Sequence, residues 1–115
     1  MSILDLFRAK GKPDLDQLVL GQLRKAGSDL TKAHKIEFFV YFPTQSVAEQ
    51  ASYFIRNAGF EVDVARAAQG GTWLCFATKT MIPELQILQK IRQDFVTLAT
   101  SMNGEYDGWG TQTVR

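Results

Sequence analysis

The chain has very little of the residue types that most often carry chemistry. Its 115 residues include one cysteine, Cys75, and one histidine, His34. One cysteine excludes an internal disulfide bond and a cysteine-based zinc site, and one histidine excludes a histidine-rich metal site. Cys75 lies within the apolar residues 73–77, which indicates a buried, unreactive side chain. His34 stands at the entrance of a predicted strand, where we expect a surface or capping residue.

Strong net charge and long hydrophobic runs are also missing. The 13 basic and 12 acidic residues give a formal net charge of +1, so no strong field favours nucleic acid or an anionic membrane. No segment approaches the roughly 20 apolar residues that span a bilayer. The apolar run at residues 1–8 is too short for a secretory signal. We therefore expect a cytoplasmic protein with one domain, residues 14–115, after a flexible lead-in at residues 1–13.

No catalytic constellation stands out either. Glu105 and Asp107 are two residues apart on a predicted strand, which is a weak signal for a metal site. Residues 69–71 include two glycines, but the segment is too short for a phosphate loop and joins two predicted strands. The sequence therefore predicts a non-enzymatic protein with no cofactor and no metal.

The chain does have a regular succession of helix and strand patterns. Helices are predicted at residues 14–27, 46–59 and 83–104, and strands at residues 36–42, 60–64, 72–79 and 106–114. The expected caps are Asp14 and the pair Ser46 and Glu49, with Pro83 as the first residue of the last helix. The apolar stripe of the first helix is Leu15, Leu18, Val19 and Leu23. A bulge is expected at Gly108 or Gly110.

The order of these elements predicts the fold. One helix is followed by two strand–helix–strand units, and the two middle strands are placed to pair as a hairpin. Such units form a four-stranded antiparallel sheet with two helices on one face. We therefore predict an α+β protein, a ferredoxin-like α/β sandwich (βαββαβ) with an extra N-terminal helix alongside the sheet or over an edge.

The other face of the predicted sheet is a candidate binding surface. Strand periodicity places its more polar side chains together: they are Glu37, Phe39, Tyr41, Glu61 and Asp63. The third strand adds either Trp73, Cys75 and Ala77 or Thr72, Leu74 and Phe76. The aromatic residues either pack beneath the first helix, bind a basic protein segment beside the acids, or stack on RNA bases. The acids disfavour RNA because they repel phosphates.

The most specific stretch of the chain lies near its end. It reads Gly104-Glu105-Tyr106-Asp107-Gly108-Trp109-Gly110-Thr111. Tyrosine and tryptophan combine a large apolar body with a polar tip, which suits a half-buried binding surface. The same composition fits a structural role, with Trp109 in the core, the glycines at a bulge and the acids in solvent.

This terminal block, with residues 27–32, 36–39, 59–62 and 73–75, resembles the regulator of ribonuclease activity B family. Members of that family are also described as ribonuclease E inhibitors. The resemblance spans about residues 14–114. It implies a small cytoplasmic bacterial protein with an α+β sandwich fold, which binds the endoribonuclease or its degradosome complex. Such a protein alters RNA processing and decay without cutting RNA, and the family brings no catalytic residues and no cofactor.

Our first hypothesis is therefore a protein-binding regulator of an RNA-degrading enzyme. The expected contact residues are Glu105, Tyr106, Asp107 and Trp109, supported by Glu37, Phe39, Tyr41, Glu61 and Asp63. The alternative is a small-molecule or peptide-sensing domain, in which Trp109, Tyr106 and Trp73 line a pocket. A deep apolar pocket with convergent polar groups favours the alternative, and a flat exposed patch favours the protein partner.

Overall fold

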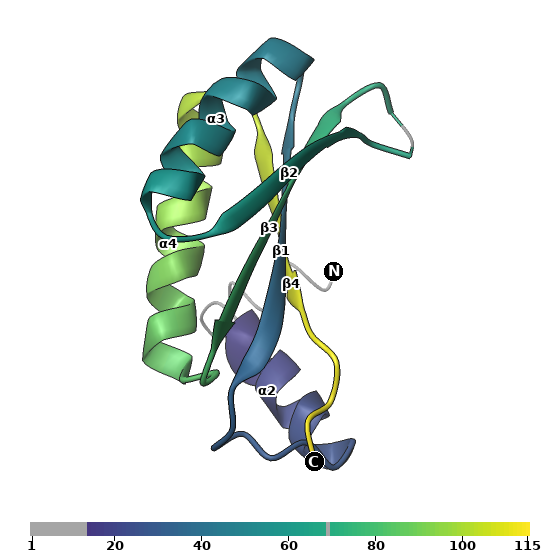
Figure 1. Cartoon of the computed structure of the whole chain (residues 1–115), viewed down its shortest axis with the longest axis vertical. Helices are drawn as coiled ribbons and strands as arrows, with labels where there is room; N and C mark the ends of the chain where they lie inside the picture. The colour runs from purple at the N-terminus through teal and green to yellow at the C-terminus, as the bar shows by residue number, and fades with distance from the viewer. Residues whose placement is uncertain (1–13, 69) are drawn as a thin grey trace, which may run out of the picture.

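The computed structural model describes residues 14–68 and 70–115, which form three helices and one four-stranded sheet (Figure 1). The helices are α2 (Leu15–Lys25), α3 (Gln45–Asn57) and α4 (Leu85–Ser101). The strands are β1 (His34–Phe42), β2 (Glu61–Arg66), β3 (Trp73–Met81) and β4 (Glu105–Gly110). The expected lead-in at residues 1–13 and Gln69 of the predicted turn lie outside the described residues.

The strands form one antiparallel sheet in the order β2-β3-β1-β4. The second and third strands pair as a hairpin, and β1 lies in the middle between β3 and β4. This order, with a helix ahead of the first strand, confirms the predicted α+β fold. It leaves β2 and β4 as the two edges of the sheet.

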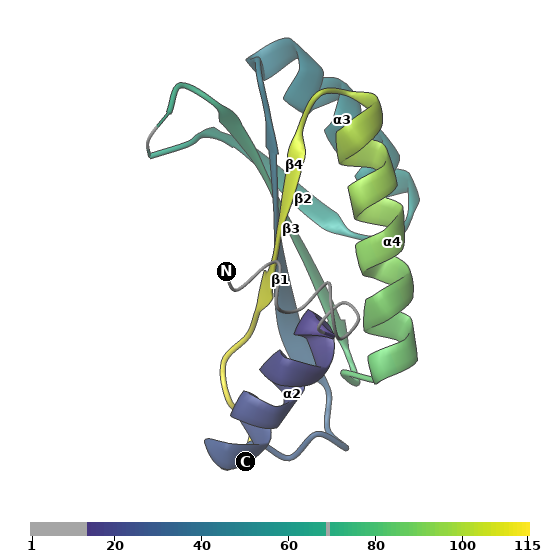
Figure 2. The ribbon, with the colours of Figure 1, turned by 180° about the vertical axis from the view of Figure 1, so that it is seen from behind.

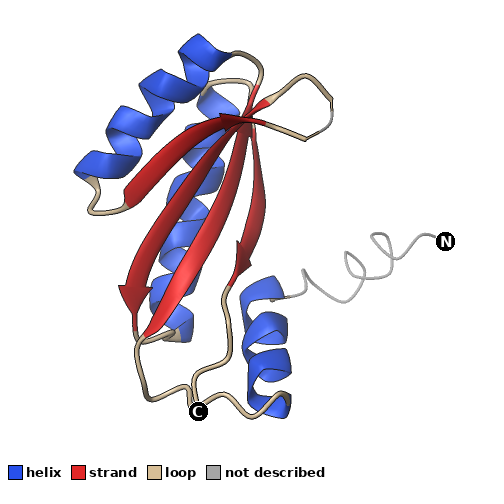
Figure 3. Cartoon of the chain, turned by 45° about the vertical axis from the view of Figure 1, so that its right-hand side comes forward, coloured by secondary structure: helices blue, strands red, loops and turns tan. Residues whose placement is uncertain are grey.

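Two helices cover one face of the sheet and leave the other face free of described helices. Figures 1 and 2 show α3 and α4 on the same side, and Figure 3 looks onto the opposite side. The core lies beneath these helices. There Phe38 of β1 makes edge-on contacts with Phe60 and with Phe95 of α4, each at 5.5 Å between ring centroids. Alternate residues of β1 are buried in this core: Ile36, Phe38, Val40 and Phe42.

The helix starts differ in part from the prediction. Asp14 caps α2 as expected, because its carboxylate accepts a hydrogen bond from the backbone N–H of Gln17 at 3.0 Å. The expected cap at Ser46 is wrong. Thr44 is already extended after Pro43, and its hydroxyl accepts from the N–H of Val47, so α3 begins earlier. Pro83 precedes the cap residue of α4 instead of opening the helix.

The last strand is shorter than predicted and ends at Gly110. Beyond it the chain leaves β1 and packs on the loop between α2 and β1. The carbonyl of Val114 accepts from the N–H of Asp29 at 2.6 Å, and the N–H of Val114 donates to the Ser28 hydroxyl at 3.0 Å. These contacts replace the ladder bonds that a longer strand would have made. Among the described helices, none is both long and apolar enough to cross a membrane.

An acidic-aromatic face and a cleft beside it

The sheet face opposite α3 and α4 carries an aromatic pair between acids. Phe39 of β1 lies directly opposite Phe76 of β3, with 5.5 Å between ring centroids. Asp63 of β2 pairs with Phe76 on one side, and Phe39 faces the Asp107–Gly108 irregularity of β4 on the other. We define the acidic-aromatic face by the acids and large apolar residues on this side, which also carries Lys35 and Thr78: Glu37, Phe39, Tyr41, Glu61, Asp63, Leu74, Phe76, Glu105 and Asp107. Both aromatic rings of the pair are half-buried.

The register decides the question that the sequence left open for β3. Leu74 and Phe76 pair with Tyr41 and Phe39, so this alternation lies on the acidic-aromatic face. Cys75 and Ala77 are fully buried on the opposite side, beneath the helices. Burial raises the pKa of the Cys75 thiol to about 11, which confirms the expectation of an inert core cysteine.

The first helix does not lie over the acidic-aromatic face. Its buried side contacts Trp109, which lies opposite Phe38 and therefore on the same side of the sheet as α4. Figure 3 shows α2 beside the end of the sheet. Phe39 and Tyr41 point the other way, so they are not packed beneath this helix. The predicted placement of the helix alongside the sheet is confirmed.

The terminal block alternates between the two sides of β4. Glu105 is exposed opposite Tyr41, whereas Tyr106 lies opposite Val40 on the core side. The register shifts between Val40 and Phe38, and Gly108 adopts a φ of +101° there. The expected bulge is therefore confirmed at Gly108. As a result the acids of the block face solvent, and Tyr106 and Trp109 face the helices.

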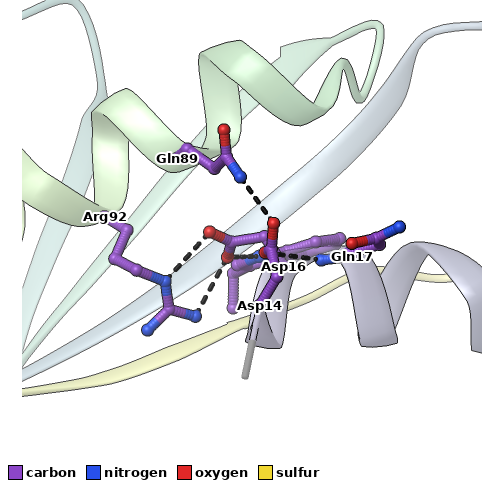
Figure 4. A network of polar contacts seen from close by, with 6 residues as sticks. Asp14, Asp16, Gln17, Gln89 and Arg92 are labelled. Atoms are coloured by element: carbon purple, nitrogen blue, oxygen red, sulfur yellow. Dashed lines mark hydrogen bonds and ion pairs between the residues drawn. The ribbon is translucent and has the colours of Figure 1, made fainter. Parts of the chain in front are cut away.

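A buried carboxylate joins α2, α4 and β4. Asp16 is only 1% exposed and receives two hydrogen bonds from Arg92, from Nε and Nη2, each at 2.9 Å (Figure 4). The indole N–H of Trp109 donates to the same carboxylate, also at 2.9 Å. The hydrogen bonds that Arg92 donates to Asp16 raise the pKa of Arg92 above its usual value. Because each partner comes from a different element, this network holds α2 against the sheet.

The apolar stripe expected for α2 is wrong in part. Leu23 is buried as predicted, and its neighbours on the buried side are Asp16 and Leu20. Leu15 and Leu18 are 48% and 55% exposed. The sequence pattern does not predict that Asp16 is buried. A charged carboxylate is buried only when it has partners, and here these are Arg92 and Trp109 from distant segments.

The exposed leucines form one wall of a cleft between α2 and β4. The cleft has a volume of about 430 Å³. It is lined by Leu15, Leu18, Val19, Gln22, Arg92, Tyr106, Asp107, Gly108 and Trp109. Two of the three aromatic residues expected in a pocket, Tyr106 and Trp109, are thus among its walls, whereas Trp73 is not. Trp73 pairs with Phe42 in the β1–β3 ladder.

Tyr106 is held among charged and aromatic neighbours. Its ring lies 5.7 Å from that of Phe95, and the Arg92 guanidinium lies 5.6 Å from its centroid. Burial raises the pKa of Tyr106 well above its usual range, although the charge of Arg92 opposes the shift. Within the described part of the chain, its hydroxyl is buried without a hydrogen-bond partner.

The single histidine is a core residue, so the expected surface position is wrong. His34 is fully buried. Its Nδ1 lies 2.8 Å from the carbonyl of Lys32, and its Nε2 lies 2.6 Å from the Ser28 hydroxyl. Since a carbonyl only accepts, Nδ1 donates to it, and Nε2 shares a hydrogen bond with the Ser28 hydroxyl. Both ring nitrogens therefore have structural partners. Among the described residues, no group of three or more His, Cys, Asp or Glu is arranged to hold a metal.

Comparison with known proteins places the chain in a family. A family model described as "Regulator of ribonuclease activity B" matches residues 14–111. The chain is 31% identical over 102 residues to a protein of that name from Pseudoalteromonas atlantica, covering 85% of this chain and 87% of the relative. It is 29% identical over 115 residues to a protein of the same name from Shewanella amazonensis, covering 96% of this chain and 80% of the relative. The chain therefore belongs to the regulator of ribonuclease activity B family, whose name indicates a regulator of ribonuclease activity.

Proposed function

We propose that this chain inhibits an endoribonuclease of the ribonuclease E type by binding it, alone or within its degradosome complex. In this proposal the chain acts in the cytoplasm of a bacterium and does not cut RNA itself. The family membership supports a ribonuclease as the partner. The acidic-aromatic face supports direct binding to protein, and it is the single observation that carries the proposal.

The composition of the acidic-aromatic face fits a protein partner. Protein interfaces place energetically important apolar or aromatic side chains in the centre and polar groups at the rim. Here the Phe39–Phe76 pair forms the centre, and carboxylates on β2 and β4 flank it. The same carboxylates repel RNA phosphates. A basic segment of the enzyme therefore suits this surface better than the RNA that the enzyme cuts.

The residues expected from the sequence take two different roles in this proposal. Glu37, Phe39, Tyr41, Glu61, Asp63, Glu105 and Asp107 belong to the acidic-aromatic face and contact the enzyme. Tyr106 and Trp109 lie on the opposite side of β4. They hold the strand in place and thereby present Glu105 and Asp107.

A charge reversal on this face tests the proposal. We expect the Asp63→Lys, Glu105→Lys double variant to bind purified ribonuclease E at least about tenfold more weakly than the wild type, because carboxylates at both edges of the face become cations. The same variant should lose most of its inhibition of RNA cleavage. Binding is measured by calorimetry and cleavage with a labelled RNA substrate.

The matched control is the Glu49→Lys, Glu84→Lys double variant, which changes the net charge equally. Both glutamates are exposed and lie outside the acidic-aromatic face, on α3 and at the start of α4. We expect this control to bind and inhibit like the wild type. Wild-type chain that neither binds nor slows the enzyme would refute the choice of partner. Equal binding by a folded Asp63→Lys, Glu105→Lys variant would refute the choice of surface.

A further inference from the structure

The cleft between α2 and β4 lies on the other side of β4 from the Phe39–Phe76 pair. Its walls come from three elements: Leu15, Leu18, Val19 and Gln22 from α2, Arg92 from α4, and residues 106–109 from β4. Only Asp107 belongs both to the cleft and to the acidic-aromatic face. The cleft is therefore a second candidate surface, with its own chemistry.

One wall of the cleft is apolar and open to solvent. Leu15 and Leu18 are about half exposed, although Asp16, Leu20 and Leu23 of the same helix are buried. Large apolar side chains that line a concavity mark a surface that a ligand covers. Gly108 adds to the space, because it has no side chain and its Cβ position meets no atom within 4 Å.

The other walls offer hydrogen-bond donors and a negative charge. Arg92 uses Nε and Nη2 for Asp16, and within residues 14–68 and 70–115 its Nη1 makes no hydrogen bond and can donate to an occupant. Tyr106 contributes to the wall, but its hydroxyl is buried and is not accessible to an occupant. Asp107 places an exposed carboxylate at the rim. An occupant with an apolar side chain, a carbonyl group and a positive charge complements the leucine wall, Arg92 and Asp107, respectively.

A polypeptide backbone can also lie along this edge of the sheet. Among the described strands, β4 pairs only with β1, so its outer edge is unpaired. The other edge, on β2, is partly covered, because Arg56 donates to the carbonyl of Val62 at 2.9 Å. Unpaired edges are where extended peptides add to sheets, with alternate side chains on opposite sides. The free edge and the cleft coincide at β4.

We propose that this cleft binds an extended polypeptide segment in which a bulky apolar residue is followed by a basic residue. The apolar side chain contacts Leu15 and Leu18. A peptide carbonyl accepts from Arg92, and the basic side chain pairs with Asp107. The inference rests on the proposed function only in assigning the segment to the regulated ribonuclease.

A synthetic peptide tests this inference without the enzyme. The probe is acetyl-Gly-Leu-Lys-Phe-Lys-Gly-amide, and the readout is the NMR signal of the indole N–H of Trp109, a residue that lines the cleft and bonds to Asp16 behind it. We expect the peptide to shift this signal saturably while the Trp73 indole signal, away from the cleft, stays in place. Leu18→Glu should weaken binding at least about tenfold, because a carboxylate replaces the apolar contact and the exposed position tolerates it.

The matched control is Ile87→Glu on α4. Ile87 is 44% exposed and does not line the cleft, so this variant should bind the peptide like the wild type. No shift of the Trp109 signal, or equal binding by Leu18→Glu, would overturn the inference. A Trp109 signal that moves with protein concentration alone would assign the cleft to a second copy and overturn it as well. The peptide experiment contains no enzyme, so its outcome neither supports nor refutes binding to ribonuclease E, which the charge-reversal experiment tests.

Discussion

Asp16 illustrates how a single residue can connect distant parts of the chain. A buried carboxylate is unfavourable unless it is paired and hydrogen-bonded. Arg92 and Trp109 supply three hydrogen bonds from segments 76 and 93 residues away. Trp109 therefore has a structural role that is visible in the contacts, beside its position at the cleft. The terminal block depends on α2 as much as α2 depends on the block.

We expect Asp16→Ala to lower the free energy of unfolding by about 3 kcal/mol. The substitution leaves the Trp109 indole N–H unpaired in a buried position and removes both hydrogen bonds between Arg92 and Asp16. Arg92 keeps some hydration, because its side chain is 29% exposed, so the loss stays at the lower end for buried ion pairs. Urea unfolding followed by circular dichroism measures the change.

Asp94→Ala is the matched control for this prediction. Asp94 also pairs with a cation, Lys90, at 2.6 Å, but both side chains are more than half exposed. Exposed pairs contribute about 0–1 kcal/mol, so the control should unfold almost like the wild type. Equal effects of the two substitutions would show that burial does not set the strength of the Asp16 network.

The elements of this fold follow from local patterns, but their ends depend on neighbours. The residue types of α3 predict a helix whatever packs against it. Its cap is nevertheless Thr44 rather than Ser46, because the chain turns directly after Pro43. In β4 the pattern predicts a strand to residue 114. The structure ends it at Gly110, since the hydroxyl of Ser28 and the N–H of Asp29 bind Val114 instead.

The three glycines of the terminal block differ in what requires them. A Cβ on Gly104 would meet the carbonyl oxygen of Tyr41 and lie 2.7 Å from Cδ1 of Phe42, in the buried part of β1. Gly108 has open space around it but a φ of +101°, which L side chains rarely adopt. Gly110 has neither constraint.

We therefore predict a graded series of alanine substitutions. Gly104→Ala should lower the free energy of unfolding by about 3 kcal/mol, because β1 cannot move away. Gly108→Ala should cost about 1–2 kcal/mol through backbone strain. Gly110→Ala should stay within about 0.5 kcal/mol of the wild type. Thermal and urea unfolding of the three variants gives the ranking, and a different order would contradict the assignment of constraints.

At the scale of the whole molecule, the C-terminal segment packs against the loop between α2 and β1. Ser28 accepts from the N–H of Val114 and lies 2.6 Å from Nε2 of the buried His34. Lys32 donates to the carbonyl of Arg115 at 2.8 Å. The Ser28–Val114 and Lys32–Arg115 contacts join residues more than 80 positions apart, so they restrain the loop between α2 and β1 and the end of the chain together.

We expect Ser28→Ala to lower the free energy of unfolding by about 2 kcal/mol, because the N–H of Val114 and Nε2 of His34 both lose their partner. Ser101→Ala is the control. Its hydroxyl donates to a carbonyl of its own helix at an exposed position, and its loss should change stability by less than about 0.5 kcal/mol. A Ser28→Ala variant as stable as the control would mean that the Ser28 hydroxyl contributes nothing to holding the C-terminal segment.

The sequence by itself determined the classes of element, their order, the antiparallel α+β arrangement and the family. These depend on periodicity, turn residues and a specific terminal block, all of which are local. It also placed Glu37, Phe39, Tyr41, Glu61 and Asp63 on one face, because strand alternation needs no partner.

The tertiary structure alone decided which residues these elements contact and which side chains are buried or exposed. Register placed Phe76 beside Phe39, packing buried His34 and Asp16, and the path of α2 exposed Leu15 and Leu18 to form a cleft. Burial of a polar group and exposure of an apolar one depend on partners supplied by distant segments. Contacts between distant segments, and the burial that results from them, are therefore determined only by the tertiary structure.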